Sequence, residues 1–492
     1  NRSWAKRVHG YNSMKGNLKG SDKMKNIHIE NFIGKHIHFI GIGGISMSGI
    51  AEILLDKGYI ISGSDIHNSA IIERLRKKGA NIYIGHDSLN IKGANLIVYT
   101  AAINDDNPEL IEASKNSIPT MDRATLLGQL METYPFAIGV SGTHGKTTTT
   151  SMLSVIMEHA DLDPTILVGG EVDEIGGNVR SGSSDYFLTE ACEYVESFLK
   201  FHPYIALILN IDEDHLDYFK DIDHIYSAFL KYARLVPPDG YVVGCLDDPH
   251  VEKLMKEVKR QTISFGIEKD ADLIAHSISY DRTGCPIFIP SYMGKDGKTI
   301  HLKVPGKHNI YNALGAYATA KILGVDGNII SEALSLYHGT HRRFEVKGIV
   351  NDITVIDDYA HHPNEIRATI DILDNFPHGR IWCVFQPHTY TRTKKLFNRF
   401  VDAFQGIDKL IVTDIYAARE KDPGDIHSKD IVSTISKNGQ DAIYISNFED
   451  IVEYLNKNIE SGDIIITMGA GNIYEVGESF LKTFQKVTPK AL

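Results

Sequence analysis

The chain has 492 residues, an ordinary globular composition and a formal net charge of −12. That length predicts about three domains, and the charge argues against a general affinity for nucleic acid or acidic membranes. The four cysteines form no CxxC pair, so we expect neither a disulfide framework nor a zinc site, and we place the protein in the reducing cytoplasm. No apolar run reaches transmembrane length, which predicts no membrane-spanning segment.

Residues 1–32 begin with a basic stretch that lacks the apolar core of a secretory signal. We expect them to be a disordered extension or start, with Met24 as a candidate initiator. From residue 33, a strand in KHIHFIGIGG leads through glycines to a helix in SMSGIAEILLDKGY, and strands follow in IISGSD and NLIVYTAAI. This alternation predicts a first domain with a parallel sheet over residues 33–128.

Two further α/β units follow along the chain. The second opens with strand PFAIGVSG and helix KTTTTSMLSVIMEHA and closes with helical YNALGAYATAKIL, which predicts a central domain over residues 129–341. The third contains strands ITVIDDYA, IWCVFQP, KLIVTDIY and DIIITMGA, which predicts a C-terminal domain over residues 342–492. The predicted fold class is α/β with three domains and mainly parallel sheets.

The stretch GIGGISMSG lies between a predicted strand and a predicted helix. Gly41, Gly43 and Gly44 would let the backbone approach a diphosphate at the helix N-terminus. Asp65 ends the next strand, where a dinucleotide-binding fold places its ribose-binding acid. A tight strand-to-helix turn without a ligand would show the same pattern. The pattern also fits any nucleotide diphosphate, including a UDP-sugar, and does not specify NAD.

A second glycine-rich stretch, GVSGTHGKTTTT, resembles a phosphate-binding loop with altered spacing. The usual pattern requires a glycine at position 140, which is Val140 here. Gly142 and Gly145 instead frame a shorter GxxGKT core, in which Lys146 would reach the β- and γ-phosphates. Thr147 would place its hydroxyl on Mg²⁺. The alternative is an ordinary threonine-rich helix start, which would leave the lysine unexplained.

Two acidic stretches offer further oxygen ligands for Mg²⁺. LTEACEYVESFL and LILNIDEDHLDYF each follow a predicted strand, and ligands bind at the carboxyl ends of parallel strands. From the residues alone, most of these acids would be solvated loop residues and one or two would contact metal. The candidates are Glu190, Glu193, Glu196, Asp212, Glu213, Asp214, His215 and Asp217.

The chain resembles the Mur ligases of peptidoglycan synthesis over about residues 35–481. The motifs that carry the resemblance are HFIGIGGISMSGIAE, GTHGKTTTT, NIDEDHLD, GKHNIYNALGA, HRRFE, DDYAHHPNEI, FQPHTYTRT, TDIYAARE and MGAGNIYEV. It implies a UDP-binding Rossmann-like domain, a central ATPase and a C-terminal Rossmann-like domain. It also implies an ATP- and Mg²⁺-dependent ligase that joins L-alanine to the lactyl carboxylate of UDP-N-acetylmuramate through an acyl phosphate.

The resemblance assigns roles at the two nucleotide sites. Lys146, His215, Arg343, Asp358 and His361 would be catalytic, and the metal ligands would be Thr147, Glu193 and His215. A histidine on Mg²⁺ is unusual, so His215 rests on the resemblance. ATP would be bound by Gly142, Thr143, His144, Gly145, Lys146, Thr147, Thr148, Asn309, Asn312 and Arg343. Without the resemblance, Asn309 reads equally well as a helix N-cap.

The remaining assignments concern the UDP-substrate and the amino acid. The UDP end would be held by Gly43, Gly44, Ile45, Ser46, Ser48, Asp65 and Thr100, with Ala101 beside them. His388 and Arg392 would hold carboxylates, and Tyr416, Ala417 and Ala418 would form a small pocket that fits alanine. Thr389 and Arg419 depart from the family, since many members have arginine and glycine there, which puts the fine contacts of the alanine site in doubt.

Three alternatives stay open at this stage. A related Mur ligase adds a preformed peptide to the same acceptor. An NAD-dependent dehydrogenase built on the first glycine loop would leave Lys146 and the magnesium candidates unexplained. A regulatory nucleotide-binding protein without catalysis would not need them. We expect UDP-N-acetylmuramate and L-alanine as small-molecule partners, no nucleic acid or membrane partner, and a monomer or weak homodimer.

Overall fold

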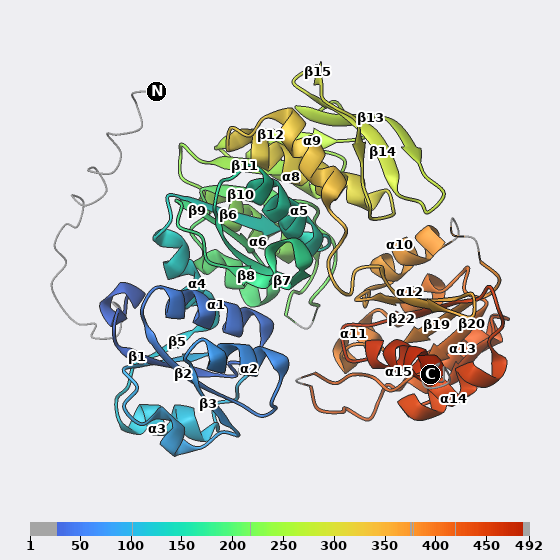
Figure 1. The fold of residues 1–492 in the computed structure, drawn as a ribbon, viewed down its shortest axis with the longest axis horizontal. Coiled ribbons are helices and arrows are strands. Elements are labelled where there is room, and N and C mark those ends of the chain that lie inside the picture. Colours follow the sequence, from blue (N-terminus) through green and yellow to red (C-terminus); the bar gives the residue numbers. More distant parts are fainter. Residues whose placement is uncertain are drawn as a thin grey trace, which may run out of the picture.

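The computed structural model describes residues 27–100, 102–216, 218–373, 376, 378–418 and 420–485. Their strands form three separate sheets, which follow one another along the chain. Figure 1 shows the first domain in blue at the lower left, the central domain in green and yellow at the top, and the C-terminal domain in orange and red at the right. The expected three-domain α/β fold class is confirmed, and the boundaries at 128 and 341 stay predictions.

The first sheet has the strand order β3-β2-β1-β4-β5, and all four strand pairs are parallel. Four of the five residues of the first strand are buried, as in a parallel sheet that is covered on both faces. The strands are β1 (His36–Ile40), β2 (Ile60–Asp65), β3 (Asn81–Ile84), β4 (Leu96–Tyr99) and β5 (Thr120–Asp122). The helices are η2 (Ile29–Phe32), α1 (Ile45–Asp56), α2 (Ala70–Lys77), η3 (Ser88–Ile91), α3 (Pro108–Lys115) and α4 (Arg123–Glu132).

The start of the first domain differs from the expectation. Residues 29–32 form η2, and Ile29 is fully buried in the core of the first domain. The Gln129 side chain accepts the Ile29 N–H and donates to the Ile27 carbonyl, so this segment is fixed to α4. Residues 27–32 are therefore ordered as part of the first domain, and the disorder expected over residues 1 to about 23, with Met24, lies outside the described residues.

The central sheet is parallel in its middle and antiparallel at both edges, in the order β15-β14-β13-β12-β11-β10-β6-β9-β7-β8 with β16 beside β14. Its strands are β6 (Phe136–Ser141), β7 (Thr165–Val172), β8 (Gly177–Arg180), β9 (Tyr186–Glu190), β10 (Ile205–Ile208), β11 (Tyr241–Cys245), β12 (Gln261–Gly266), β13 (Leu273–Tyr280), β14 (Pro286–Tyr292), β15 (Lys295–Asp296) and β16 (Ile300–His301). Its helices are α5 (Lys146–His159), η4 (Asp173–Ile175), η5 (Tyr194–Lys200), α6 (Ile222–Leu235), α7 (Pro249–Glu257), α8 (His308–Ile322) and α9 (Gly327–Leu336).

The C-terminal sheet has the order β17-β18-β22-β19-β20-β21, with only the β17–β18 pair antiparallel among its described strands. Apolar cores pack against its two faces. The strands are β17 (Glu345–Val350), β18 (Ile353–Asp358), β19 (Ile381–Phe385), β20 (Lys409–Val412), β21 (Ala442–Tyr444) and β22 (Ile464–Met468). The helices are α10 (Pro363–Leu373), α11 (Tyr390–Lys395), α12 (Phe397–Ala403), α13 (Ser428–Lys437), α14 (Phe448–Asn458) and α15 (Tyr474–Gln485).

Helix α1 joins the first domain to the central domain. Gly49 lies in the middle of α1, and a Cβ atom there would come within 2.3 Å of Leu167 Cδ1 on β7. Asn178 on β8 donates from its side chain to the Ile45 carbonyl at the start of α1, at 3.0 Å. The missing side chain of Gly49 thus permits the close helix–sheet contact that positions the first glycine loop beside the central domain.

Among the described residues, none of the helices combines the length and the apolarity that crossing a bilayer requires.

Candidate active site

The loop between β6 and α5 turns at two glycines with backbone angles that favour glycine. Gly142 has φ +144° and Gly145 has φ +85°. Gly145 is the N-cap of α5, and a Cβ atom there would lie 2.4 Å from Asn312 Oδ1. The free N–H groups at the start of α5 therefore stand beside a turn that admits no side chain, as a phosphate cradle requires.

Lys146 lies at the first position of α5 and is held by the loop and by one carboxylate. Its ammonium donates to the carbonyls of Gly142 and Thr143 and lies 3.0 Å from Glu193 Oε2. Burial works against the charge of Lys146, but the negative charge of Glu193 outweighs it and raises the pKa of the lysine. The lysine is therefore fully charged at neutral pH, as a phosphate ligand needs to be.

The predicted magnesium ligands come from three segments. Glu193, which follows β9, is 2% exposed, and His215 Nε2 lies 3.9 Å from its Oε1 atom. Thr147 is buried in the first turn of α5, next to Lys146. A hydroxyl and a buried carboxylate are hard oxygen donors that suit Mg²⁺, so the residues present fit this ion. His215 adopts φ +51°, an uncommon angle for a non-glycine residue, in the loop after β10.

The predicted adenine pair lies behind the phosphate loop. Asn312 donates to Asn309 Oδ1 at 2.9 Å, and its own Oδ1 accepts from the Thr149 hydroxyl at 3.2 Å. Helix α8 begins at His308 with Lys307 as N-cap, so the alternative reading of Asn309 as the cap is wrong. Asn309 instead donates to the Pro305 carbonyl. Both amides are buried and linked to α5, and their contact with adenine stays a prediction.

Arg343, Asp358 and His361 lie where the C-terminal domain meets the central domain. Asp358 accepts the backbone N–H groups of Phe344 and Ala360, and burial raises its pKa to about 6 against the opposing charge of Arg343. The Arg343 guanidinium stacks on Tyr359 at 5.0 Å. Burial lowers the pKa of His361 to about 4, so its ring is neutral at pH 7. The charge of Arg343 therefore acts on Asp358, and the catalytic roles of all three residues stay predictions.

His388 and Arg392 form one unit with the pocket residues. Arg392 Nη1 lies 3.0 Å from His388 Nδ1, and the His388 ring stacks on Tyr416 at 5.8 Å. Arg392 Nη2 also lies 3.0 Å from Asp214 Oδ1 in the central domain. The guanidinium is therefore already engaged by a protein carboxylate, and its contact with a substrate carboxylate stays a prediction.

The departures from the family pattern have a partial structural account. Thr389 has φ +65° and caps α11 by accepting the Arg392 N–H on its hydroxyl. It therefore orients Arg392 through the backbone instead of supplying a second guanidinium. Ala417 follows the half-exposed Tyr416, and Ala418 has φ +51°. Arg419 lies outside the described residues.

The first glycine loop lies in the first domain and leads into α1. Asp65 Oδ2 accepts the Gly43 N–H at 2.9 Å, so this carboxylate holds the backbone of the loop in place. The Ser48 hydroxyl is buried and donates to the Ile45 carbonyl. Gly44 is the N-cap of α1. Thr100 lies beside the loop, since a Cβ atom on Gly41 would come within 3.3 Å of the Thr100 methyl group. Ala101 lies outside the described residues.

Two residues that sequence reasoning did not single out complete these sites. Arg123, at the start of α4, donates to the Ser46 hydroxyl at 3.0 Å and thereby places a cation at the start of α1. Glu365 on α10 lies 3.2 Å from His144 Nδ1 and accepts the backbone N–H groups of His361 and His362. Glu365 could have been found from the sequence, because it lies three residues after His362 at the start of a helix. No local pattern marks Arg123.

Comparison with known proteins agrees with this arrangement. Three family models match consecutive parts of the chain: the Mur ligase family catalytic domain at residues 36–135, the Mur ligase middle domain at 140–320, and the Mur ligase glutamate ligase domain at 342–471. The chain belongs to the Mur ligase family. In this Mur ligase, most strands of each sheet lie within the range that one family model matches.

Curated relatives match this Mur ligase over nearly their whole length. The UDP-N-acetylmuramate–L-alanine ligase of Caldanaerobacter subterraneus subsp. tengcongensis is 56% identical over 460 residues, covering 94% of this chain and 100% of that protein. The enzyme of the same name from Acetivibrio thermocellus is 59% identical over 454 residues, covering 92% and 97%.

Solved structures of two kinds of Mur ligase share the fold. The UDP-N-acetylmuramate–alanine ligase of Thermotoga maritima has a TM-score of 0.79 at 30% identity and covers 92% of this chain and 100% of that one. A murein peptide ligase from Psychrobacter arcticus has a TM-score of 0.72 at 25% identity and covers 93% and 100%.

Proposed function

We propose that this Mur ligase joins L-alanine to the lactyl carboxylate of UDP-N-acetylmuramate at the expense of ATP. The observation that carries the proposal is the identity of 56% and 59% to two L-alanine-adding relatives over nearly the full length of each. The arrangement of Lys146, Glu193 and His215 around the α5 N-terminus supports an ATP-dependent reaction.

The chemistry explains why ATP is required. A carboxylate resists nucleophilic attack because it is negatively charged and because oxide is a poor leaving group. The lactyl carboxylate oxygen attacks the γ-phosphorus of ATP, ADP departs, and an acyl phosphate forms. The neutral amine of L-alanine then attacks the acyl carbon, the tetrahedral intermediate expels phosphate, and the amine proton is released.

The protein's own groups serve this reaction by positioning and by charge. Lys146 would hold the β- and γ-phosphates, and Arg343 would add a second positive charge from the C-terminal domain. Glu193 and Thr147 would hold Mg²⁺, which neutralises phosphate charge when bound, and His215 would lie beside it. Asn309 and Asn312 would contact the adenine.

The two substrates would approach from opposite sides. The first glycine loop, which the Gly43–Asp65 hydrogen bond fixes, would hold the UDP end on the first domain together with Arg123. His388 and Arg392 would hold carboxylates, and Tyr416 with its two alanines would accept a small side chain on the C-terminal domain. We propose that the protein acts in the cytoplasm as a monomer or weak homodimer, without nucleic-acid or membrane partners.

The decisive experiment measures ADP release with the full chain, ATP, Mg²⁺ and UDP-N-acetylmuramate against a panel of amino acids. We expect ADP release with L-alanine, slower release with glycine and serine, and background release when the UDP-substrate is omitted. No ADP above background in the complete mixture would refute the proposal. Release with a tripeptide but not with L-alanine would instead support the peptide-adding alternative.

A further inference from the structure

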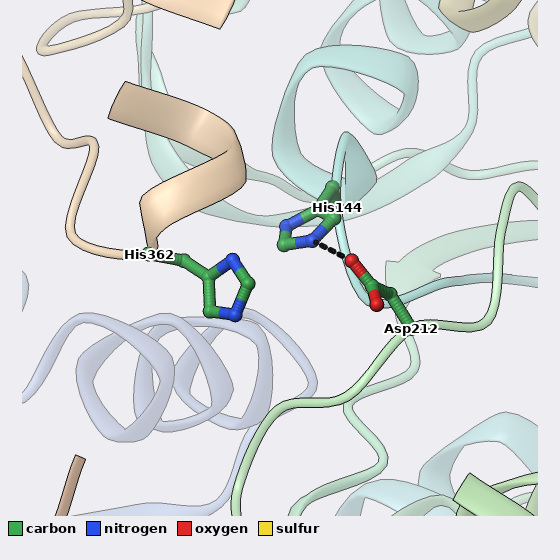
Figure 2. A group of neighbouring side chains, drawn as sticks. All are labelled: His144, Asp212 and His362. Carbon is green, nitrogen blue, oxygen red and sulfur yellow. Dashed lines mark hydrogen bonds and ion pairs between the residues drawn. The ribbon is translucent and has the colours of Figure 1, made fainter. Parts of the chain in front are cut away.

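Three side chains from two domains meet next to the phosphate loop. They are His144 in that loop, Asp212 in the segment after β10, and His362 just before α10 of the C-terminal domain. Each offers one ligand atom, and these atoms all lie within 4.8 Å of one another. Figure 2 shows the His362 ring turned toward the other two side chains, and its dashed line marks the contact between His144 and Asp212.

The surroundings of both imidazoles suit metal ligation. His144 Nδ1 lies 3.2 Å from Glu365 Oε1 and can donate its N–H to that carboxylate. Nε2, which lies 3.4 Å from Asp212 Oδ2, can bind a metal ion once its own proton is displaced. His362 Nε2 lies 3.1 Å from the Glu213 carbonyl, which can only accept, so the lone pair lies on Nδ1. That lone pair receives only a long bond of 3.3 Å from the Asn364 N–H. A carboxylate or carbonyl behind each histidine is the usual outer layer of a protein metal site.

We propose that His144, Asp212 and His362 bind a divalent transition-metal ion, with Zn²⁺ as the best match, between the central and C-terminal domains. Two imidazoles and one carboxylate are ligands that Zn²⁺ accepts readily, whereas Mg²⁺ prefers oxygen donors. The site is therefore chemically distinct from the set of Thr147, Glu193 and His215. The spacing of the cysteines predicted no zinc site, but this site contains no cysteine.

The geometry requires a small closing movement. Metal–ligand distances of about 2.0–2.1 Å in a tetrahedral site place neighbouring ligand atoms roughly 3.4 Å apart. His144 Nε2 and Asp212 Oδ2 already have that separation, at 3.4 Å. The His362 nitrogen belongs to the other domain and lies within 4.8 Å of the other two ligand atoms, so it would move closer to bind the same ion. Binding of the ion would therefore draw α10 toward the phosphate loop and hold the two domains together.

Two carboxylates border the site and favour a cation there. Asp212 Oδ2 lies 3.4 Å from His144 Nε2, and Glu365 Oε1 lies 3.2 Å from His144 Nδ1. Metal ligation requires an unprotonated imidazole nitrogen, so binding of the ion would displace any proton on the ligating nitrogens.

Isothermal titration of the full chain with Zn²⁺, in excess Mg²⁺ to occupy oxygen-rich sites, tests the proposal without any dependence on catalysis. We expect one equivalent of Zn²⁺ to bind to the unaltered protein. His362→Asn and Asp212→Asn should each weaken binding by more than about 100-fold, since loss of even an outer-layer partner costs about 10–100-fold. His338→Asn, at an exposed histidine far from the site, and Glu193→Gln should leave the affinity unchanged.

Circular dichroism and cooperative thermal unfolding establish that each variant is folded. His362 is buried, so Asp212→Asn, at a partly exposed side chain, decides the matter if His362→Asn fails to fold. Absence of saturable one-to-one binding would overturn the proposal, as would full affinity in Asp212→Asn. Loss of zinc binding in Glu193→Gln alone would place the ion at the magnesium ligands and would also overturn it.

Discussion

The Arg392 guanidinium of the C-terminal domain forms an ion pair with the Asp214 carboxylate of the central domain, with 3.0 Å between Nη2 and Oδ1. The two residues are 178 positions apart in the chain, and their side chains are about 10% and 9% exposed. Burial disfavours the Asp214 charge, but the charges of His215 and Arg392 lower its pKa well below the usual range. This pair therefore links the segment after β10 to the start of the predicted alanine pocket.

Replacing Asp214 with asparagine should destabilise the protein by about 3 kcal/mol, because it leaves the Arg392 charge buried without a counterion. The free energy of unfolding in urea, with and without the substitution, measures the effect. Asp223→Asn on the exposed face of α6 is the matched control and should change stability by less than about 0.5 kcal/mol. Equal stability of the two variants would show that the pair contributes nothing.

Replacing Lys146 with alanine should lower kcat at least about 10²-fold, because the lysine is the cation nearest the expected phosphates. ADP release under saturating substrates measures this. Lys231→Ala on α6 removes an exposed lysine that pairs with Glu196 of η5, and this variant should keep its activity. Retention of more than half of the activity in the Lys146 variant would refute the proposed role.

The Arg123 side chain gives a prediction for the UDP-substrate alone. Arg123→Gln should raise KM for UDP-N-acetylmuramate on the order of 10-fold, about 1.4 kcal/mol, with KM for ATP unchanged. The reason is that Arg123 donates to the Ser46 hydroxyl at the start of α1. Steady-state kinetics in both substrates, with Arg76→Gln on α2 as a surface control, separates the two effects. A parallel rise in both KM values would count against a local role.

Asp358 predicts a pH dependence of stability. Its folded pKa is raised to about 6 by burial, against an ordinary value of 3.8, so between these values the unfolded chain has lost a proton that the folded chain keeps. This group therefore adds stability below about pH 4 that is lost as pH rises to 6, by up to about 3 kcal/mol. Asp358→Asn should remove that part of the pH dependence, measured by urea unfolding at pH 4.5 and 7.5.

The matched control for that experiment is Asp402→Asn, at an exposed position of α12. It should leave the difference in stability between pH 4.5 and pH 7.5 as in the unaltered protein. An identical pH dependence in the Asp358 variant would mean that the carboxyl titrates normally in the folded state.

Gly49 predicts an effect at the contact between the first two domains. Alanine normally stabilises a helix interior by about 1 kcal/mol relative to glycine. Here the new Cβ would come within 2.3 Å of Leu167 Cδ1, so Gly49→Ala should instead destabilise the protein by roughly 1–3 kcal/mol. In a Leu167→Ala background the same change should cost less, which a double-mutant cycle in urea measures. A net gain of stability in the single variant would show that α1 and β7 have room to separate.

Much of the architecture could be predicted from local patterns. The apolar strands that run into GIGG and GTHGK predicted two strand-to-helix loops, and both loops form as expected. The lysine after Gly145 and the acidic stretches after two strands predicted which segments converge, because parallel strands end at the same edge of a sheet. The ordered start at residues 27–32 was not predicted, because a short segment docked by Gln129 carries no periodic signal.

By itself the sequence determined the three α/β units, the two glycine loops and the residue types around them, because those features depend on neighbours within a few positions. Only the tertiary structure decided the pairs that join distant segments: Arg392 with Asp214, Arg123 with Ser46, and His144 with Asp212 and His362. Such pairs depend on how separate sheets pack against one another. No local spacing encodes that packing, since it is set by whole domain surfaces meeting.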